Sequence, residues 1–399
     1  MEKMRKVFHE KFGSENAKIV KSPLRICPLG AHVDHQHGLV TGMALDASVS
    51  MMYSPNDSGY ARVQSLDFPD EEYFSIDHAP EMIPGFWGNY LRGAVLSLAR
   101  SFKLKRGING VIRGRLPIGG LSSSAAVTTA YLLALADVNG LVIEKPDLIR
   151  YSHWVEKEFI GLYNGILDQS ANILSRNDHL LYMDCRTEDY SLIPKNPAMP
   201  AFAVLVVYSG INKILISTDY NNRVDECKVA AWILQETGCG RVTPFKEVRL
   251  RDISEEFYME HRGALPGRFR RRADHFYSEN NRVRQGVECW KKGDLAGLGK
   301  LIFESGESSI HQYESGAPQL ITIYDILKEC PGVYGARFSG AGYRGCCIGI
   351  IDPAYKEAVK QRIDSRYPAK HPDFKDVYRV YFAGLDDGAR ILGKDESLL

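Results

Sequence analysis

The chain has 399 residues, and its 50 basic and 49 acidic side chains give a formal net charge of +1. It contains no long basic run, so we expect no nucleic acid partner. Its longest apolar runs, such as 201–208, have the length of strands and are too short to span a bilayer. Segment 1–16 is charged and lacks the apolar core of a signal sequence. None of the eight cysteines forms a CxxC pair, which argues against a zinc site and favours reduced thiols in the cytoplasm.

Taken in chain order, apolar periodicity and turn residues predict two α+β units. In the first half we expect helices 1–12, 87–101, 127–136 and 146–159, a helix from 166, and strands 19–24, 40–53, 60–66 and 110–114. In the second half we expect strands 202–208, 332–338, 346–351 and 377–382, and helices 220–236, 273–292, 294–306, 320–328 and 354–367. The polar, proline-containing stretch 189–200 predicts a boundary between units 1–190 and 200–399. The basic cluster 262–272 is interpreted as a solvated connection.

The segment Leu116–Ala126 reads Leu-Pro-Ile-Gly-Gly-Leu-Ser-Ser-Ser-Ala-Ala and lies between a predicted strand and a predicted helix. Glycines let a backbone approach a ligand closely, and the serines fall where the first helical N–H groups lack partners. Such a helix start attracts anions. The segment therefore predicts a cradle for a nucleoside triphosphate, although it lacks the GxxxxGK[ST] pattern. An N-capped core helix remains the alternative interpretation.

A second polar segment, 25–38, separates two apolar ones, and its proline and glycines mark it as a loop. It contains His32, Asp34, His35 and His37. These residue types can bind a transition metal, but no second cluster of ligands accompanies them. A polyhydroxylated ligand explains the mixture better, because a carboxylate accepts hydroxyl hydrogens and histidine can donate or accept.

Two further features leave alternatives open. Asp168 is an acidic residue among apolar ones near a helix start, where it is either a carboxylate favoured by the helix dipole or a buried base. Segment 340–345 matches GxGxxG, but a strand-like run follows it instead of the helix that dinucleotide sites require. We interpret it as a glycine-rich turn between two strands, which either faces a phosphate or is purely structural.

Together these segments resemble the GHMP small-molecule kinases. The motifs are 25–38, 117–126 and 335–347, with further matches at 87–90, 156–169 and 220–227, so that the resemblance spans nearly the whole chain in the family's order. Within the family, Arg25–His35 and Gly165–Gln169 resemble the sugar loop and the base loop of galactokinases. The resemblance implies a GHMP kinase fold with an N-terminal half like ribosomal protein S5 domain 2, a ferredoxin-like C-terminal half, and an active site between them.

The resemblance also implies roles for individual residues. Asp168 matches the acid that takes or orients the proton of the sugar C1 hydroxyl, and Arg25 matches the cation beside it. The residues that match the cradle of the ATP phosphates are Pro117, Gly119, Gly120, Leu121, Ser122, Ser123 and Ser124. Ser124 and Glu156 match ligands of Mg²⁺, whereas the sugar contacts are His32, Asp34, Gly165 and Tyr220. The implied partners are ATP and a small sugar acid, with no nucleic acid or membrane, for a monomer or homodimer.

Two departures from the galactokinase pattern bear on the substrate. Galactokinases carry Glu at the position of Ala31, next to the C6 end of the sugar, and usually Gly at the position of Arg344. A C6 carboxylate would be repelled by Glu and tolerated by Ala31, and Arg344 offers a cation. Segments 24–32 and 335–347 resemble the branch of the family that phosphorylates galacturonate, so we expect galacturonate 1-phosphate as the product. The alternatives are galactose or another hexose or hexuronate, and a catalytically silent sensor of sugar and ATP.

Overall fold

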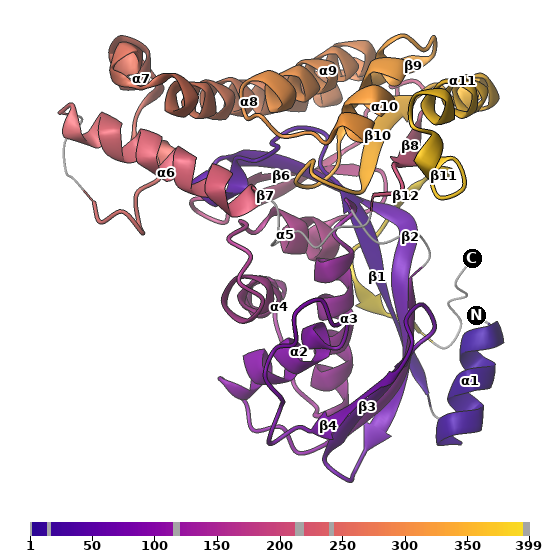
Figure 1. Ribbon diagram of the computed structural model, residues 1–399. Coiled ribbons are helices and arrows are strands. Elements are labelled where there is room, and N and C mark those ends of the chain that lie inside the picture. The colour runs from indigo at the N-terminus through magenta and orange to yellow at the C-terminus, as the bar shows by residue number, and fades with distance from the viewer. Residues whose placement is uncertain (1, 14–16, 115–119, 212–218, 239–242, 394–399) are drawn as a thin grey trace.

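The structure is a computed structural model that describes residues 2–13, 17–114, 120–211, 219–238 and 243–393. The chain forms two sheets, each covered by helices (Figure 1). In the larger sheet the strand order is β13-β1-β2-β5-β3-β4, and in the smaller sheet it is β11-β8-β10-β9. The mixed α+β class predicted from the sequence is confirmed.

The larger sheet is built around one long strand, β2 (Leu39–Asn56), which pairs antiparallel with four other strands, β1, β5, β6 and β12. Strands β3 and β5 form a parallel pair. The other strands of this sheet are β1 (Lys18–Ile26), β3 (Tyr60–Ser65), β4 (Glu71–Ser75), β5 (Gly107–Gly114), β6 (His179–Asp184), β7 (Tyr190–Pro194), β12 (Leu385–Asp386) and β13 (Arg390–Ile391). Strand β1 ends at the pocket described below, so Arg25, near the end of this strand, lines the pocket.

Four helices cover one face of the larger sheet: α2 (Asn89–Ala99), α3 (Ser123–Val138), α4 (Lys145–Trp154) and α5 (Leu167–Leu174) (Figure 1). Helix α3 packs closely because small buried residues, among them Ala126, Ala130 and Ala134, line it. Helix α1 (Glu2–Phe12) buries Met4 and Phe8 in a separate small cluster with Val111 of β5. The start of α3 and the start of α5 both lie near the end of β1.

The smaller sheet has a core of its own, in which residues of α10 (Pro318–Lys328) and α11 (Lys356–Lys370) pack on it. Its strands are β8 (Ala203–Tyr208), β9 (Val333–Phe338), β10 (Cys346–Ile351) and β11 (Arg379–Ala383). Helix α9 (Leu295–His311) runs beside α8 (Gly267–Lys292), and α6 (Tyr220–Glu236) and α7 (Glu255–His261) complete this half. Helix α8 also reaches the larger sheet, since Asn280 Oδ1 accepts the Leu39 N–H at 2.7 Å.

The interpretation of 262–272 as a solvated connection is wrong for its second part. Helix α8 begins at Gly267, and Arg272 is buried, where it bonds Glu226 and Glu314, each at 2.7 Å. The spacing of Phe269, Ala273 and Phe276 puts apolar residues on one helical face and explains why the helix extends this far. The charged residues between them hid this period in the sequence.

The other predicted elements are confirmed with shifted ends. The predicted helix 146–159 is α-helical only to Trp154 and continues as one π-helical turn, Val155–Phe159. Six further elements, most of them short, are not predicted from the sequence: β4, β6, β7, α7, β12 and β13. The division into 1–190 and 200–399 stays a prediction. Strands β12 and β13, from near the C-terminus, pair with β2 and β1 of the first half, so the two predicted units share one sheet.

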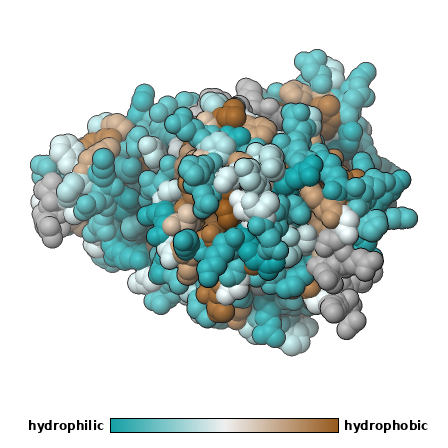
Figure 2. All heavy atoms as spheres, turned by 90° about the horizontal axis from the view of Figure 1, so that it is seen from below, coloured by the Kyte–Doolittle hydropathy of each residue, from teal (hydrophilic) through white to brown (hydrophobic). Residues whose placement is uncertain are grey.

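The face of the molecule seen from below is mostly hydrophilic, with hydrophobic residues in small patches (Figure 2). Within the described part of the chain, no helix is both long enough and apolar enough to cross a membrane.

Candidate active site

A pocket forms where the end of β1, the loop before α5, the start of α6 and the turn between β9 and β10 converge. It brings together the predicted residues Arg25, Ala31, His32, Asp34, Asp168 and Tyr220. Its other lining residues are Cys27, Leu162, Asn164, Leu167, Arg337, Phe338, Gly340 and Ala341. Gly165 lies directly behind Asp34, because a Cβ atom at Gly165 would come within 2.5 Å of the carbonyl carbon of Asp34. A side chain at position 165 would therefore displace the loop.

Arg25 and Asp168 form the charged pair of the pocket. Arg25 Nε and Nη2 both donate to Asp168 Oδ1, at 2.9 and 2.6 Å, so Oδ2 is not bonded by Arg25. Arg25 is buried, whereas the Asp168 side chain is 23% exposed. Burial alone would lower the pKa of Arg25, but the charge and hydrogen bonds of Asp168 outweigh it and raise the pKa. Asp168 also lies in the first turn of α5, where the helix dipole favours a carboxylate.

Arg25 also forms hydrogen bonds with the phosphate-cradle segment (116–126) and with the third motif (335–347). Its Nη1 lies 3.4 Å from the carbonyl oxygen of Gly120 and 3.3 Å from Ser339 Oγ, and its backbone N–H donates to the Leu121 carbonyl oxygen at 3.2 Å. Arg25, which belongs to the first of the three segments that carry the resemblance, therefore contacts both of the others.

The start of α3 offers open donors. Gly120 has φ +80° and packs so closely that a Cβ atom there would lie 2.6 Å from Cys346 N. Ser122 precedes the helix in the left-handed region (φ 56°), it makes no side-chain cap, and its buried hydroxyl has no hydrogen-bond partner among the described residues. The alternative of a side-chain-capped helix is therefore wrong for Ser122. Ser123 and Ser124 form the first turn, and Pro117 and Gly119 lie outside the described residues.

Glu156 lies in the π-helical turn and is fully buried. Its Oε2 accepts from Asn164 Nδ2 at 2.6 Å and from Gln169 Nε2 at 2.7 Å, while Oε1 has no partner in hydrogen-bonding geometry within the described residues. Burial and the neighbouring charge of Asp168 raise the pKa of Glu156. A buried carboxylate oxygen without a partner suits a cation, and Mg²⁺ typically binds one or two carboxylates plus substrate phosphates. No group of three or more His, Cys, Asp or Glu side chains in the described ranges could hold a metal by itself.

The other end of the pocket contains Asp34 and His32. Burial, followed by the charge of Asp168, raises the pKa of Asp34 to about 6. His32 has φ 58°, stacks on Tyr313 with ring centroids 4.2 Å apart, and has a pKa lowered well below its ordinary value by burial and by His275. His35 is buried and bonds the Tyr313 hydroxyl at 3.1 Å. The histidines are therefore neutral donors and acceptors, as a hydroxylated ligand requires.

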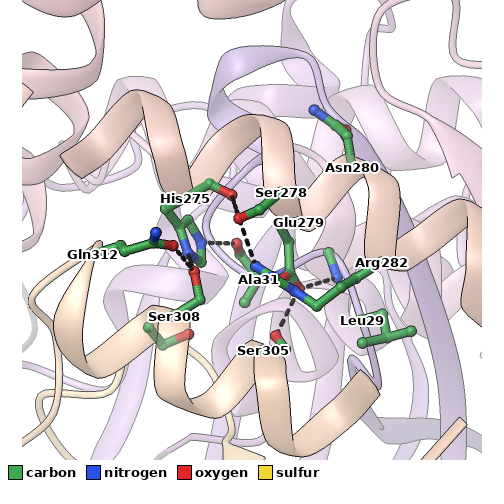
Figure 3. Close-up of polar contacts among 12 residues, drawn as sticks. Leu29, Ala31, His275, Ser278, Glu279, Asn280, Arg282, Ser305, Ser308 and Gln312 are labelled. Atoms are coloured by element: carbon green, nitrogen blue, oxygen red, sulfur yellow. Dashed lines mark hydrogen bonds and ion pairs between the residues drawn. The ribbon is translucent and has the colours of Figure 1, made fainter. Parts of the chain in front are cut away.

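The backbone of residue 31 is held from outside the pocket by α8 (Figure 3). Glu279 Oε1 accepts the N–H groups of Gly30 and Ala31 at 2.7 and 3.1 Å, and His275 Nε2 lies 2.8 Å from the carbonyl oxygen of Ala31. Arg282 and the Ser305 hydroxyl complete the shell of Glu279, each at 2.7 Å. Burial would raise the pKa of Glu279, but Arg282 and the other neighbours outweigh it and lower the pKa to about 2. Position 31 is thus fixed by an ionised buried carboxylate.

Three residues of this region are not predicted by the sequence motifs: His275, Glu279 and Arg337. The first two stand four residues apart on the buried face of α8, and polar residues on an otherwise apolar helical face were the available signal. Arg337 lies in the third motif, where Arg344 was favoured instead. The structure places Arg337 in the pocket wall, and Arg344 is not among the lining residues. Burial lowers the pKa of Arg344, and Tyr90 and Tyr208 lie close enough to oppose that effect.

The glycine-rich segment 340–345 joins β9 to β10 and is followed by a strand, which confirms the predicted turn and excludes the dinucleotide-binding arrangement. Gly340, Gly342 and Gly345 all have positive φ. Gly340 and Ala341 line the pocket, so the turn closes it beside the phosphate-cradle segment.

Comparison with known proteins agrees with this geometry. The family models for the GHMP kinases N terminal domain, the GHMP kinases C terminal domain and the galactokinase galactose-binding signature match residues 89–176, 287–369 and 6–55. Galacturonokinase from Arabidopsis thaliana is 39% identical over 400 residues, covering 94% of this chain and 93% of that protein. Galactokinase from Roseiflexus sp. (strain RS-1) is 33% identical over 387 residues, covering 96% and 95%. The crystal structure of Lactococcus lactis galactokinase complexed with galactose superposes with a TM-score of 0.88 at 24% identity, covering 97% of this chain and 98% of that one.

The chain belongs to the GHMP kinase family. It is accordingly an ATP-dependent kinase, and the fold expected from the resemblance is confirmed.

Proposed function

We propose that this kinase transfers the γ-phosphate of ATP to the anomeric hydroxyl of galacturonate, giving galacturonate 1-phosphate and ADP. The observation that carries the proposal is Ala31 in the wall of the pocket that contains Arg25 and Asp168, where galactokinases carry Glu. The similarity to a galacturonokinase over nearly the whole chain supports the same substrate. The similarity to a galactokinase makes galactose the main alternative.

The chemistry follows from the charged pair. Asp168 Oδ2, which Arg25 leaves unbonded, is the group that accepts or orients the proton of the C1 hydroxyl. As the C1 oxygen bonds to the γ-phosphorus, the bond to the β-phosphate oxygen breaks and ADP leaves. Arg25 pairs with Asp168 and offsets charge on the transferred phosphoryl group. Catalysis by these residues is mainly positioning and electrostatic stabilisation.

The start of α3 is the proposed holder of the ATP phosphates, through Gly120, Leu121, Ser122, Ser123 and Ser124, with Pro117 and Gly119 from the adjoining segment outside the described residues. Glu156 and Ser124 would hold Mg²⁺, which would supply charge neutralisation for the phosphates. Glu156 Oε1 and the Ser122 hydroxyl have no hydrogen-bond partner among the described residues, and this supports the assignments. His32, Asp34, Gly165 and Tyr220 are the proposed contacts of the sugar.

Position 31 is the proposed point of discrimination between a sugar and its acid. A Glu there and a substrate carboxylate about 4 Å apart would repel each other by about 4 kcal/mol at an effective dielectric constant of 20. The methyl group of Ala31 brings no charge and leaves room. A galactose C6 hydroxyl, in turn, loses the acceptor that Glu provides in galactokinases. These two effects act in the same direction and favour the acid.

The proposal is tested by incubating the purified enzyme with Mg²⁺-ATP and a panel of galacturonate, glucuronate, galactose and glucose. We expect ATP consumption to be fastest with galacturonate, and ³¹P NMR of the product to show phosphate on C1. Faster turnover of galactose would replace the proposed substrate with the main alternative. Absence of turnover with every sugar, together with retained binding, would identify a silent sensor instead.

A further inference from the structure

Glu279 of α8 holds the backbone of the loop that carries Ala31, although it does not reach the pocket itself. Glu279 is 0% exposed and is not a lining residue, so it cannot touch a substrate bound there. Its Oε1 accepts the N–H groups of Gly30 and Ala31, and the carboxylate also accepts from Arg282 and Ser305 (Figure 3). Any effect of Glu279 on the reaction must therefore pass through this backbone.

The backbone on either side of Ala31 has a conformation that needs support. Gly30 and His32 have φ of 101° and 58°, in the left-handed region, where a residue other than glycine is strained. A Cβ atom at Gly30 would lie 2.6 Å from Val40 Cα, so the loop packs directly on β2. Strained residues persist only where their surroundings hold them, and here the hydrogen bonds from α8 do so.

His275, about one helical turn before Glu279, holds the carbonyl side of the same residue. Its Nε2 lies 2.8 Å from the Ala31 carbonyl oxygen, and because a carbonyl oxygen only accepts, Nε2 carries the proton. Its Nδ1 lies 2.8 Å from the hydroxyl of Ser308 on α9. Burial lowers the pKa of His275 to about 4, which keeps the ring neutral. Both the N–H and the C=O of Ala31 are therefore bonded to α8.

The loop that α8 holds is separate from the charged pair of the pocket. Ala31, His32 and Asp34 line the pocket from this loop. Arg25 and Asp168 come from β1 and α5 and are bonded to each other. Loss of the hydrogen bonds from α8 would therefore displace the proposed sugar contacts and leave the proposed reacting pair in place.

We infer that Glu279 and His275 are positioning residues of the sugar site, which fix residues 31–34 relative to Asp168 and so set the affinity for the sugar without touching it. This inference rests on the proposed function, because it takes residues 31–34 as contacts of the sugar, but it applies to an acid and to a neutral sugar alike. When the binding-competent conformation of a loop is only partly populated, the apparent affinity falls by that fraction. An ionised carboxylate taken out of water is costly, and the backbone that it holds explains why Glu279 is charged.

The test measures kcat and KM for galacturonate and for galactose, and KM for ATP, in Glu279→Gln. Gln has nearly the same size but no charge, so it holds the two N–H groups less tightly, and KM for either sugar should rise about 10- to 100-fold. We expect kcat and KM for ATP to stay near their wild-type values, since the change removes sugar binding and not the stabilisation of the transition state.

Trp290→Phe is the control for a mere loss of stability. It removes a buried side-chain hydrogen bond of the same helix, from Trp290 Nε1 to the Ile193 carbonyl oxygen at 2.9 Å, which does not involve the loop. Its KM for either sugar should equal that of the wild type. A fall of kcat at unchanged sugar KM in Glu279→Gln, or an equal rise of the sugar KM in Trp290→Phe, overturns the inference.

His275 supplies a second pair of variants, which also covers the case in which Glu279→Gln folds poorly. The amide of a glutamine can place an N–H group near the position of Nε2, whereas leucine has no donor. His275→Leu should therefore raise KM for the sugars, and His275→Gln should restore most of the affinity. Equal sugar KM values in the two variants would overturn the role of His275.

Hydrogen exchange of single backbone amides tests the inference without catalysis. The Gly30 and Ala31 amides should exchange about tenfold or more faster in Glu279→Gln than in the wild type. The Arg25 amide, which bonds the Leu121 carbonyl oxygen, is the internal control and should keep its rate. Unchanged exchange of Gly30 and Ala31 overturns the inference, whereas a wild-type preference for galactose overturns only the proposed substrate.

Discussion

The two ends of the pocket differ in how their charges are balanced. At the Asp168 end, the cation and the acid are bonded to each other, and Arg25 also contacts the phosphate-cradle segment and Ser339. At the Ala31 end, the buried cation Arg337 has two donors without partners among the described residues. The charge pair of the reacting end is therefore complete within the protein, whereas the Ala31 end contains a buried cation without an ion-pair partner among the described residues. The following predictions test this contrast.

The largest effect is expected at the complete end. Asp168→Asn removes the proton acceptor and leaves Arg25 without its charge partner, so kcat should fall about 10²- to 10⁴-fold. The measurement is steady-state turnover of ATP with galacturonate. Asp147→Asn, which changes an exposed carboxylate of α4, serves as the control and should keep wild-type turnover. A loss of less than tenfold in Asp168→Asn would mean that Asp168 has no part in proton transfer.

The next effect is expected at the Ala31 end. Ala31→Glu brings a negative charge to this end, so it should repel a galacturonate carboxylate. With repulsion of about 4 kcal/mol, the galacturonate-to-galactose ratio of kcat/KM should fall up to about 10³-fold. Ala31→Gln has nearly the same size without the charge, and we expect a much smaller shift. Equal shifts in both variants would assign the effect to size instead of charge.

A third effect concerns the folding of the ligand-free enzyme. The pKa of Asp34 is raised from 3.8 to about 6 by burial and by Asp168, so the native state holds this proton more tightly than the unfolded chain does. The resulting stabilisation is present below pH 4 and is lost as the pH rises through 6. Relative to Asp34→Asn, the wild type should therefore lose on the order of 3 kcal/mol of unfolding free energy between pH 4 and pH 8.

Urea unfolding of the wild type and of Asp34→Asn at the two pH values measures this difference. In Asp147→Asn the difference from the wild type should not change with pH. A wild type that gains stability relative to Asp34→Asn as the pH rises would show that Asp34 is stabilised as a carboxylate, opposite to the expectation.

The smallest effect is expected at the proposed metal ligand. Glu156→Gln keeps an oxygen but removes the charge, so about tenfold or more Mg²⁺ should be needed for half-maximal turnover. Magnesium titration of the reaction at saturating ATP measures this. Glu158→Gln, two residues away and exposed, is the matched control and should keep the wild-type requirement. An unchanged requirement in Glu156→Gln would remove Glu156 from the magnesium site.

Much of this contrast could be predicted from the sequence, and the part that could not has a physical reason. The Arg25–Asp168 pair and the turn at 340–345 could be predicted, because the residue types in their motifs indicate a charged pair and a glycine-rich turn. The earlier start of helix α8 was missed because charged residues interrupt its apolar period. One of them, Arg272, pairs with Glu226 and Glu314 from distant segments, and such long-range pairing leaves no local signal.

The place of Arg337 in the pocket wall was missed for a similar reason. The third motif contains two arginines, and the sequence pattern makes Arg344 conspicuous because galactokinases usually have Gly there. Which of the two faces the pocket depends on the strand β9 and its neighbours, because Arg337 lies on that strand and Arg344 lies in the turn after it. The hydrogen bonds of His275 and Glu279 to the backbone of residue 31 likewise join residues more than 240 positions apart.

The most direct test of the central claim is an internal competition. Equal concentrations of galacturonate and galactose are mixed with limiting Mg²⁺-ATP, and the two sugar 1-phosphates are quantified in the same sample, so their ratio gives the ratio of kcat/KM. We predict an excess of galacturonate 1-phosphate with the wild type, and a much smaller excess with Ala31→Glu. An excess of galactose 1-phosphate with the wild type would contradict the account.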